Sequence, residues 1–169
     1  MKAKLIVEGK EFDIDILDPE LQKLVKPPKK TGYERADKCS HYWFIDADGT
    51  LNGYDSDEHD EVDDVYYEAA NYYSDKTVAE NNVRADKLMR QLRRYAVEQR
   101  KYKIYWTKTP DEKWSIVYDC PNNRIIPYKH WDVREAFVIY FDTEETAKNA
   151  ITLYHDELIW YFTEYKDSL

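Results

Sequence analysis

Residues 137–162 read FVIYFDTEETAKNAITLYHDELIWYF, and this stretch decides the fold that the sequence predicts. It begins with aromatic and β-branched residues, Phe137 to Phe141, which are typical of a buried strand. Asp142 and Glu145 then have the spacing of a helix cap. The apolar positions after them recur at helical spacing: Ala147, Ala150, Ile151, Tyr154, Leu158, Tyr161 and Phe162. We therefore expect a strand followed by one long amphipathic helix.

A weaker copy of this unit lies upstream, at residues 69–95, which read AANYYSDKTVAENNVRADKLMRQLRRY. Further upstream, residues 42–45 (YWFI) resemble residues 113–116 (KWSI). The aligned pairs are Tyr73 with Phe141, Ala79 with Ala147, and Trp43 with Trp114. Each copy predicts strand, turn, strand, loop, strand and helix, with residues 65–73 as the third strand of the first copy. The pattern indicates an internal duplication.

The sequence therefore predicts an α+β fold of tandem β-β-β-α repeats, with antiparallel strands each packed by a long helix. We place the first unit at residues 33–106 and the second at residues 107–169. Residues 1–28 precede them as a β-hairpin and a short helix, which Asp18-Pro19 begins and Pro27-Pro28 ends. Residues 26–32 are the best candidate for a linker, and we expect the parts to form one compact body.

Composition excludes several classes of protein. A chain of 169 residues can bury a core, and its aromatic content of 15% is too high for a disordered chain. It has no apolar run near 20 residues, and its first residues lack the apolar core of a signal peptide. Cys39 and Cys120 lie in different segments, which favours a reducing compartment. We expect a cytoplasmic protein without membrane contact and without a cofactor or metal.

The net charge of −9 is unevenly distributed. Residues 46–64 contain nine Asp or Glu and no Lys or Arg, and we expect the last ten of these residues to form a solvated loop. The carboxylates predicted to bind a partner are Asp55, Asp57, Glu58, Asp60, Glu61, Asp63 and Asp64. Carboxylates arrayed in this way imitate nucleic-acid phosphates and fit a basic groove on another protein. A calcium loop is the alternative, but its turn glycine and closing glutamate are misplaced.

Residues 84–103 carry the opposite charge, with eight Lys or Arg against two acidic residues. Lys87, Arg90 and Arg94 fall opposite the apolar stripe of the predicted helix. Tyr102 and Tyr105 follow, and aromatic rings beside basic residues suit single-stranded nucleic acid. Nucleic-acid binding through this helix is therefore the second functional hypothesis, with an ordinary solvated helix face as its alternative.

Residues 44–51, FIDADGTL, resemble motif I of haloacid-dehalogenase-like phosphatases. The resemblance implies that Asp46 is the nucleophile and Asp48 the general acid. Against it, the Asp-Gly joins two short strands, and the family's downstream motifs are not found. We interpret the motif as a type I′-like hairpin turn. His41, His130 and His155 have no Ser or Cys at a suggestive spacing. We therefore expect a protein that is not an enzyme.

Leu153 and Trp160 lie on a second side of the C-terminal helix, away from its apolar stripe. A surface helix needs one apolar face, so a second face requires another partner. Trp is enriched at interface hot spots, and a two-fold axis would use this face twice. We expect a homodimer through these two residues, or else the N-terminal hairpin folding over them.

Five segments carry a resemblance to known proteins. They are KLIVEGKEF (4–12), TGYER (31–35), YWFID (42–46), NYYSDKTVAE (71–80) and IYFDTEETAKNAI (139–151). Together they resemble small phage and prophage proteins of unassigned function. The resemblance implies a protein that acts in the cytoplasm of an infected host and names no catalytic residue. The first functional hypothesis is a non-enzymatic inhibitor of a host nucleic-acid-handling or defence complex, as anti-CRISPR proteins are.

Overall fold

The computed structural model describes residues 2–7, 10–17, 30–54, 56–106, 112–131 and 133–166. The chain divides into two compact units, Met1–Thr31 and Gly32–Leu169, and the division falls inside the predicted linker. Helices and two-stranded antiparallel sheets make up the described residues, so the predicted α+β class is confirmed.

The first unit contains one antiparallel hairpin. Strand β1 (Lys2–Val7) pairs with β2 (Lys10–Asp15), with Lys2 opposite Asp15 and Val7 opposite Lys10. This confirms the hairpin expected from alternating apolar and polar residues. The short helix predicted before Pro27-Pro28 lies outside the described residues.

The second unit contains two further antiparallel hairpins. Strand β3 (Tyr42–Ile45) pairs with β4 (Leu51–Tyr54), and β5 (Lys113–Asp119) pairs with β6 (Arg124–His130). A short 3₁₀ turn, Cys120–Asn122, joins β5 to β6, and Asn123 follows it in the left-handed conformation. Asn tolerates this conformation better than most residues, which explains its place at the turn.

Each of these hairpins gains one further pairing residue. Trp43 exchanges two backbone hydrogen bonds of 2.8 Å with Tyr73, and Trp114 exchanges bonds of 2.9 and 2.7 Å with Phe141. The N-cap of a helix lies two residues after each bridge, at Asp75 and at Thr143, and Ala79 and Ala147 are fully buried at matching positions. Local pairing is thus alike in the two halves, while descent from a duplication stays a prediction.

The predicted third strands are wrong. Residues 61–68 form helix α2 (Glu61–Glu68) instead of the start of a strand, and in residues 137–141 only Phe141 pairs with a strand. Helix α2 forms because Asp60 and Asp63 make a reciprocal capping box, which satisfies the free N–H groups of its first turn. The pattern of valines and tyrosines in residues 62–73 is also typical of a strand, so local pattern did not distinguish the two.

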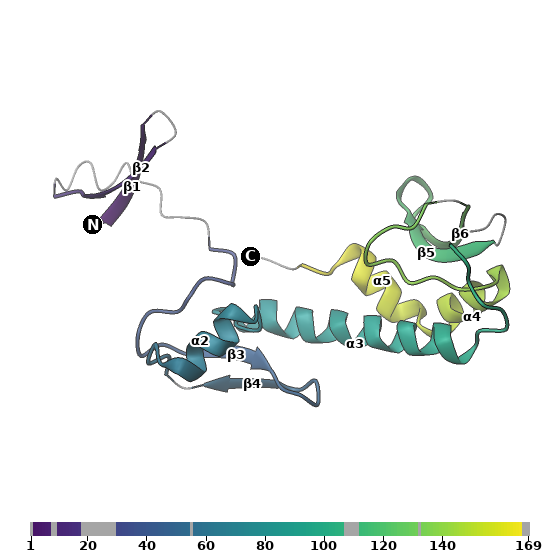
Figure 1. The fold of residues 1–169 in the computed structure, drawn as a ribbon, viewed down its shortest axis with the longest axis horizontal. Helices are drawn as coiled ribbons and strands as arrows, with labels where there is room; N and C mark the ends of the chain where they lie inside the picture. Colours follow the sequence, from purple (N-terminus) through teal and green to yellow (C-terminus); the bar gives the residue numbers. More distant parts are fainter. Residues whose placement is uncertain are drawn as a thin grey trace. The chain divides into compact units, whose positions relative to one another are not determined.

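Helix α3 (Lys76–Glu98) joins the two hairpins. The capping-box spacing of Thr77 and Glu80 predicts a helix start near Thr77. The structure instead places the cap at Asp75, which accepts a 3.0 Å bond from the Val78 N–H. The first half of α3 contacts β3 and β4, and its second half packs against α4 (Glu144–Leu153) and α5 (His155–Thr163) (Figure 1).

The predicted C-terminal helix is broken in two at Tyr154, whose backbone leaves the helical region with φ −112° and ψ 23°. The Tyr154 ring packs edge-on against Tyr95 of α3, with ring centres 6.0 Å apart. Thr143 caps α4, because the predicted cap Asp142 turns away and accepts the N–H groups of Lys101 and Tyr102.

The main core lies where α3, α4 and α5 meet the β5–β6 hairpin. Its buried members are Leu88, Leu92, Ala96, Phe141, Ala147, Ala150 and Leu158. Ala147, Ala150 and Leu158 belong to the apolar stripe predicted within residues 137–162. Full burial of a leucine contributes roughly 2 kcal/mol, so these side chains hold the helices together. Within the described residues, the helices are too short or too polar to cross a bilayer.

Candidate protein-interaction site

The acidic segment before α2 is ordered, contrary to the prediction of a solvated loop. Asp57 is 0% exposed and Asp63 is 5% exposed, so these two carboxylates face the interior and do not reach a partner. Asp55 lies outside the described residues. Glu58, Asp60, Glu61 and Asp64 remain on the surface, where their role in binding stays a prediction.

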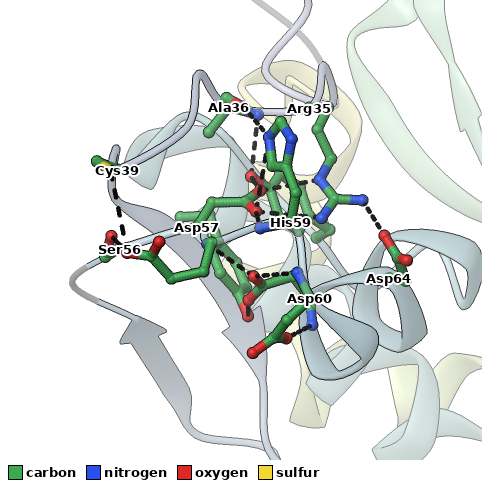
Figure 2. Close-up of polar contacts among 12 residues, drawn as sticks. Arg35, Ala36, Cys39, Ser56, Asp57, His59, Asp60 and Asp64 are labelled. Atoms are coloured by element: carbon green, nitrogen blue, oxygen red, sulfur yellow. Dashed lines mark hydrogen bonds and ion pairs between the residues drawn. The ribbon is translucent and has the colours of Figure 1, made fainter.

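Asp57 is the centre of a buried network (Figure 2). Its Oδ2 accepts the Arg35 Nε–H at 2.9 Å and the Tyr72 hydroxyl at 2.6 Å. Its Oδ1 accepts the second guanidinium N–H at 3.1 Å and the backbone N–H of His59 at 2.8 Å. Both oxygens are therefore saturated, so Asp57 has no lone pair left for a metal ion or for proton abstraction.

The electrostatics of this network favour a fixed ion pair. Burial alone would raise the pKa of Asp57, but the hydrogen bonds from Arg35, Tyr72 and the His59 N–H outweigh burial and hold that pKa well below its usual range. The same bonds raise the pKa of Arg35, and burial raises that of Tyr72. Arg35 also reaches Asp64 at 2.6 Å, which ties the loop to the first turns of α2.

Asp63 connects α2 to strand β3 and to the loop that precedes the helix. It accepts the Tyr42 hydroxyl at 2.8 Å and the backbone N–H of Glu58 at 2.8 Å. The Tyr42 ring stacks on Tyr72 with centres 4.3 Å apart, and burial raises the pKa of Tyr42. Because both tyrosines also bond to a buried carboxylate, these contacts connect the hairpin, the loop and α2.

The outer face of α2 carries both charge and apolar surface. Glu61, Asp64, Val65 and Glu68 recur at the spacing of one helix face, and all four are exposed. Val65 is 64% exposed, and Val62 beside it is half exposed. We call these five residues the α2 face: Glu61, Val62, Asp64, Val65 and Glu68. Two exposed valines between carboxylates make this face a candidate for binding a partner.

Within the described residues, the structure groups no three His, Cys, Asp or Glu side chains in a way that would hold a metal ion. The acidic segment instead uses its oxygens to accept hydrogen bonds from backbone and side-chain groups of the same segment. Asp60 accepts the N–H groups of Val62 and Asp63, and Glu58 accepts the Ser56 hydroxyl.

Asp46 and Asp48 lie in the loop between β3 and β4, so the predicted hairpin is confirmed. Asp46 accepts the Asn52 amide, and Asp48 accepts the Thr50 hydroxyl and N–H, which lower the pKa of Asp48. The turn is not type I′, because only Gly49 in it has a positive φ. Both carboxylates stabilise the loop through these hydrogen bonds. The expectation that the chain is not an enzyme stays a prediction.

The predicted basic face is present on α3. Lys87, Arg90 and Arg94 are all exposed, as expected from the helical period. Arg94 forms an ion pair with Glu98 at 3.9 Å, and the Arg90 guanidinium lies against Gly49 of the hairpin turn. Binding of nucleic acid at this face stays a prediction.

Trp160 is covered within the chain. It is 8% exposed, because the Arg84 guanidinium of α3 lies 4.0 Å from its ring centre and Tyr165 packs against it. Arg84 is held there by Glu157 at 2.8 Å. Trp160 is therefore unavailable to a second copy, and the predicted dimer now rests on Leu153 alone, which is 61% exposed.

Sequence reasoning missed one polar pair. Ser115 of β5 and His130 of β6 lie 2.8 Å apart, Oγ to Nε2, and Glu135 lies 3.9 Å from His130 Nδ1. Only the hairpin register could have revealed the pair, since the residues are fifteen apart in sequence. Ser115 is buried and the glutamate is beyond hydrogen-bond distance, so the hydroxyl is not presented to a substrate.

Comparison with protein-family models, with curated proteins and with solved structures finds no match to this chain.

Proposed function

We propose that this protein acts without catalysis, by binding a basic surface of another protein through the α2 face. The observation that carries the proposal is the exposure of Val62 and Val65 between the carboxylates of Glu61, Asp64 and Glu68. Apolar side chains supply contact area at an interface, while the carboxylates select a basic partner.

The Arg35–Asp57 pair supports this proposal because Arg35 fixes the loop before α2 and also bonds to Asp64 of the helix. A surface that is already ordered loses little entropy when it binds, which favours affinity. Carboxylates on a rigid helix also steer a basic partner toward the correct orientation during association.

The resemblance to small phage and prophage proteins favours one class of partner. A host complex that handles nucleic acid exposes a basic groove, and an acidic protein that fills this groove would inhibit the complex. We therefore propose an anti-defence protein of the anti-CRISPR kind that acts in the cytoplasm of an infected bacterium.

The test compares two variants of equal charge change. Glu61→Ser with Glu68→Ser alters the α2 face, and Asp86→Ser with Glu164→Ser removes two exposed carboxylates elsewhere. Each tagged protein is incubated with nuclease-treated bacterial lysate, and the captured proteins are quantified by mass spectrometry. We expect the wild type and the control to capture the same basic protein, and the α2 variant to lose it. Equal capture by both variants would contradict the proposal.

Salt dependence provides a second criterion. Exposed charges are screened over about 8 Å at physiological ionic strength, so added salt should slow association with the basic partner, as the substitutions of the α2 variant do.

A second candidate function, nucleic-acid binding through α3, is favoured by the exposure of Lys87, Arg90 and Arg94. It predicts that Arg90→Ala with Arg94→Ala abolishes binding to a labelled single-stranded oligonucleotide, while the α2 variant binds it as well as or better than the wild type.

A further inference from the structure

Phe137 combines two features that oppose folding. Its side chain is 95% exposed, so burial contributes nothing to stability there. Its backbone is left-handed, with φ +64°, which is costly for a bulky residue without a local reason. A strained residue that gains nothing from packing is a candidate for a role in binding.

The surroundings of Phe137 are hollow on two sides. A cavity of about 170 Å³ lies between α3, α5 and residues 137–141, and Leu92, Ile116 and Phe162 are among its apolar walls. A second hollow of about 380 Å³ is lined by residues 137–140 and by Arg93, Val97 and Arg100. Phe137, Val138 and Ile139 line both, so the two hollows adjoin one another along this segment.

The charge of this surface is positive. Arg93 and Arg100 are exposed, and neither forms an ion pair among the described residues. Between them, Val97 is 63% exposed. Two free guanidinium groups beside an apolar hollow favour a ligand that carries carboxylates next to an apolar group.

We propose that this surface, the Phe137 patch (Arg93, Val97, Arg100, Phe137 and Val138), binds an acidic segment of a partner protein. One large apolar side chain of the segment would enter the 170 Å³ cavity, and flanking carboxylates would pair with Arg93 and Arg100. The cavity is smaller than the roughly 300 Å³ of the smallest usual small-molecule sites, which favours a single side chain. Its apolar walls offer few groups that hydrogen-bond a base, so nucleic acid fits less well.

This patch is distinct from the α2 face and of opposite charge, so the inference does not depend on the proposed function. The two surfaces together would let one molecule contact a basic and an acidic protein surface. Hot-spot residues in such interfaces are large side chains at the centre of a patch, with charged groups around them.

The experiment selects peptides from a displayed library of random 12-residue sequences on the immobilised full chain. We expect enrichment of sequences with Asp or Glu on both sides of Leu, Phe, Ile, Met or Trp. The affinity of one synthetic winner is then measured by fluorescence anisotropy. Phe137→Gly, and separately Arg93→Gln with Arg100→Gln, should each weaken binding by roughly tenfold or more. Lys148→Gln with Lys166→Gln, an equal charge change at other exposed sites, should leave it unchanged.

Phe137→Gly also separates binding from folding. Glycine adopts a positive φ without strain, so the melting temperature should stay the same or rise while binding falls. The proposal is overturned if no acidic sequence is enriched, or if Phe137→Gly binds as the wild type does. It is also overturned if a single-stranded oligonucleotide displaces the peptide, or if sedimentation shows self-association that Phe137→Gly abolishes.

Discussion

Asp57 was predicted to bind a partner at the surface, but in the structure it stabilises the fold from the interior. It is fully buried and accepts four hydrogen bonds, two of them from Arg35. Bidentate pairing of this kind is stronger than a simple ion pair, and removal of one partner leaves the other charge poorly solvated.

We predict that Asp57→Asn lowers the free energy of unfolding by about 3 kcal/mol, as expected when one partner of a buried ion pair is lost. Urea denaturation measures the change, and Asp37→Asn, an exposed aspartate nearby, is the matched control. The control should change stability by less than about 0.5 kcal/mol. Equal effects of the two substitutions would contradict the assigned role of Asp57.

The depressed pKa of Asp57 predicts loss of stability in acid. An aspartate in an unfolded chain has a pKa of about 3.9, and the pKa of Asp57 in the folded protein is lower. The unfolded state therefore takes up its proton first as pH falls, and the stabilisation, complete above about pH 5, declines below pH 4. Free energies of unfolding at pH 7, 5 and 3 should show this decline, and Asp57→Asn should make it shallower. A slope unaffected by the substitution would assign the acid sensitivity to other groups.

At the scale of elements, α2 separates its anchoring residues from its exposed ones. Asp60 caps the helix and Asp63 bonds to Tyr42, whereas Glu61 and Glu68 bond to no described residue. Substitutions within this one acidic segment should therefore have opposite consequences for stability and for binding.

We predict that Glu61→Ser with Glu68→Ser leaves the free energy of unfolding within about 0.5 kcal/mol of the wild type. Asp60→Ala should lower it by about 1 kcal/mol, because the helix loses its cap. Thermal denaturation followed by circular dichroism gives both values. If the surface pair proved as destabilising as the cap variant, the α2 face would be part of the structure and not a free binding surface.

The contact between α3 and α5 leads to a prediction about Trp160. Because Arg84 and Tyr165 cover this ring, Trp160→Ala should destabilise the second unit by about 3 kcal/mol. The molar mass from light scattering should be the same for the wild type and for Trp160→Ala. A lower molar mass for Trp160→Ala would support a homodimer through Trp160. Leu153→Ser tests separately whether Leu153 contributes to a dimer.

At the scale of the whole molecule, the chain divides into two compact units between Thr31 and Gly32. Among the described residues, the core clusters lie within the second unit, so we expect its stability not to depend on the first.

We predict that a fragment of residues 32–169 folds alone. Its melting temperature should lie within about 3 °C of that of the full chain. A larger shift would require the loss of core contacts within the second unit. Circular dichroism and differential scanning calorimetry provide the comparison. A fragment that melts much earlier, or without a cooperative transition, would show that the first unit contributes to the fold of the second.

Local pattern alone was enough to predict the hairpins and the apolar stripes of α3, α4 and α5. Alternation and the 3.6-residue period depend on neighbours in sequence, so residues such as Ala147, Ala150 and Leu158 could be assigned to the core directly. Comparison of the two copies aligned Trp43 with Trp114, and the structure places both residues at isolated bridges, which the comparison did not predict.

Only the tertiary structure decided which charges are buried and which apolar residues are covered. Asp57 is inside because Arg35, twenty-two positions away in sequence, comes to lie beside it. Trp160 is covered because Arg84 reaches it from another helix, and Phe137 is exposed although it begins the most apolar run of the chain. The physical reason is that the solvation of a side chain depends on which groups surround it in space. Many of these groups are distant in sequence, so residue type and spacing do not predict them.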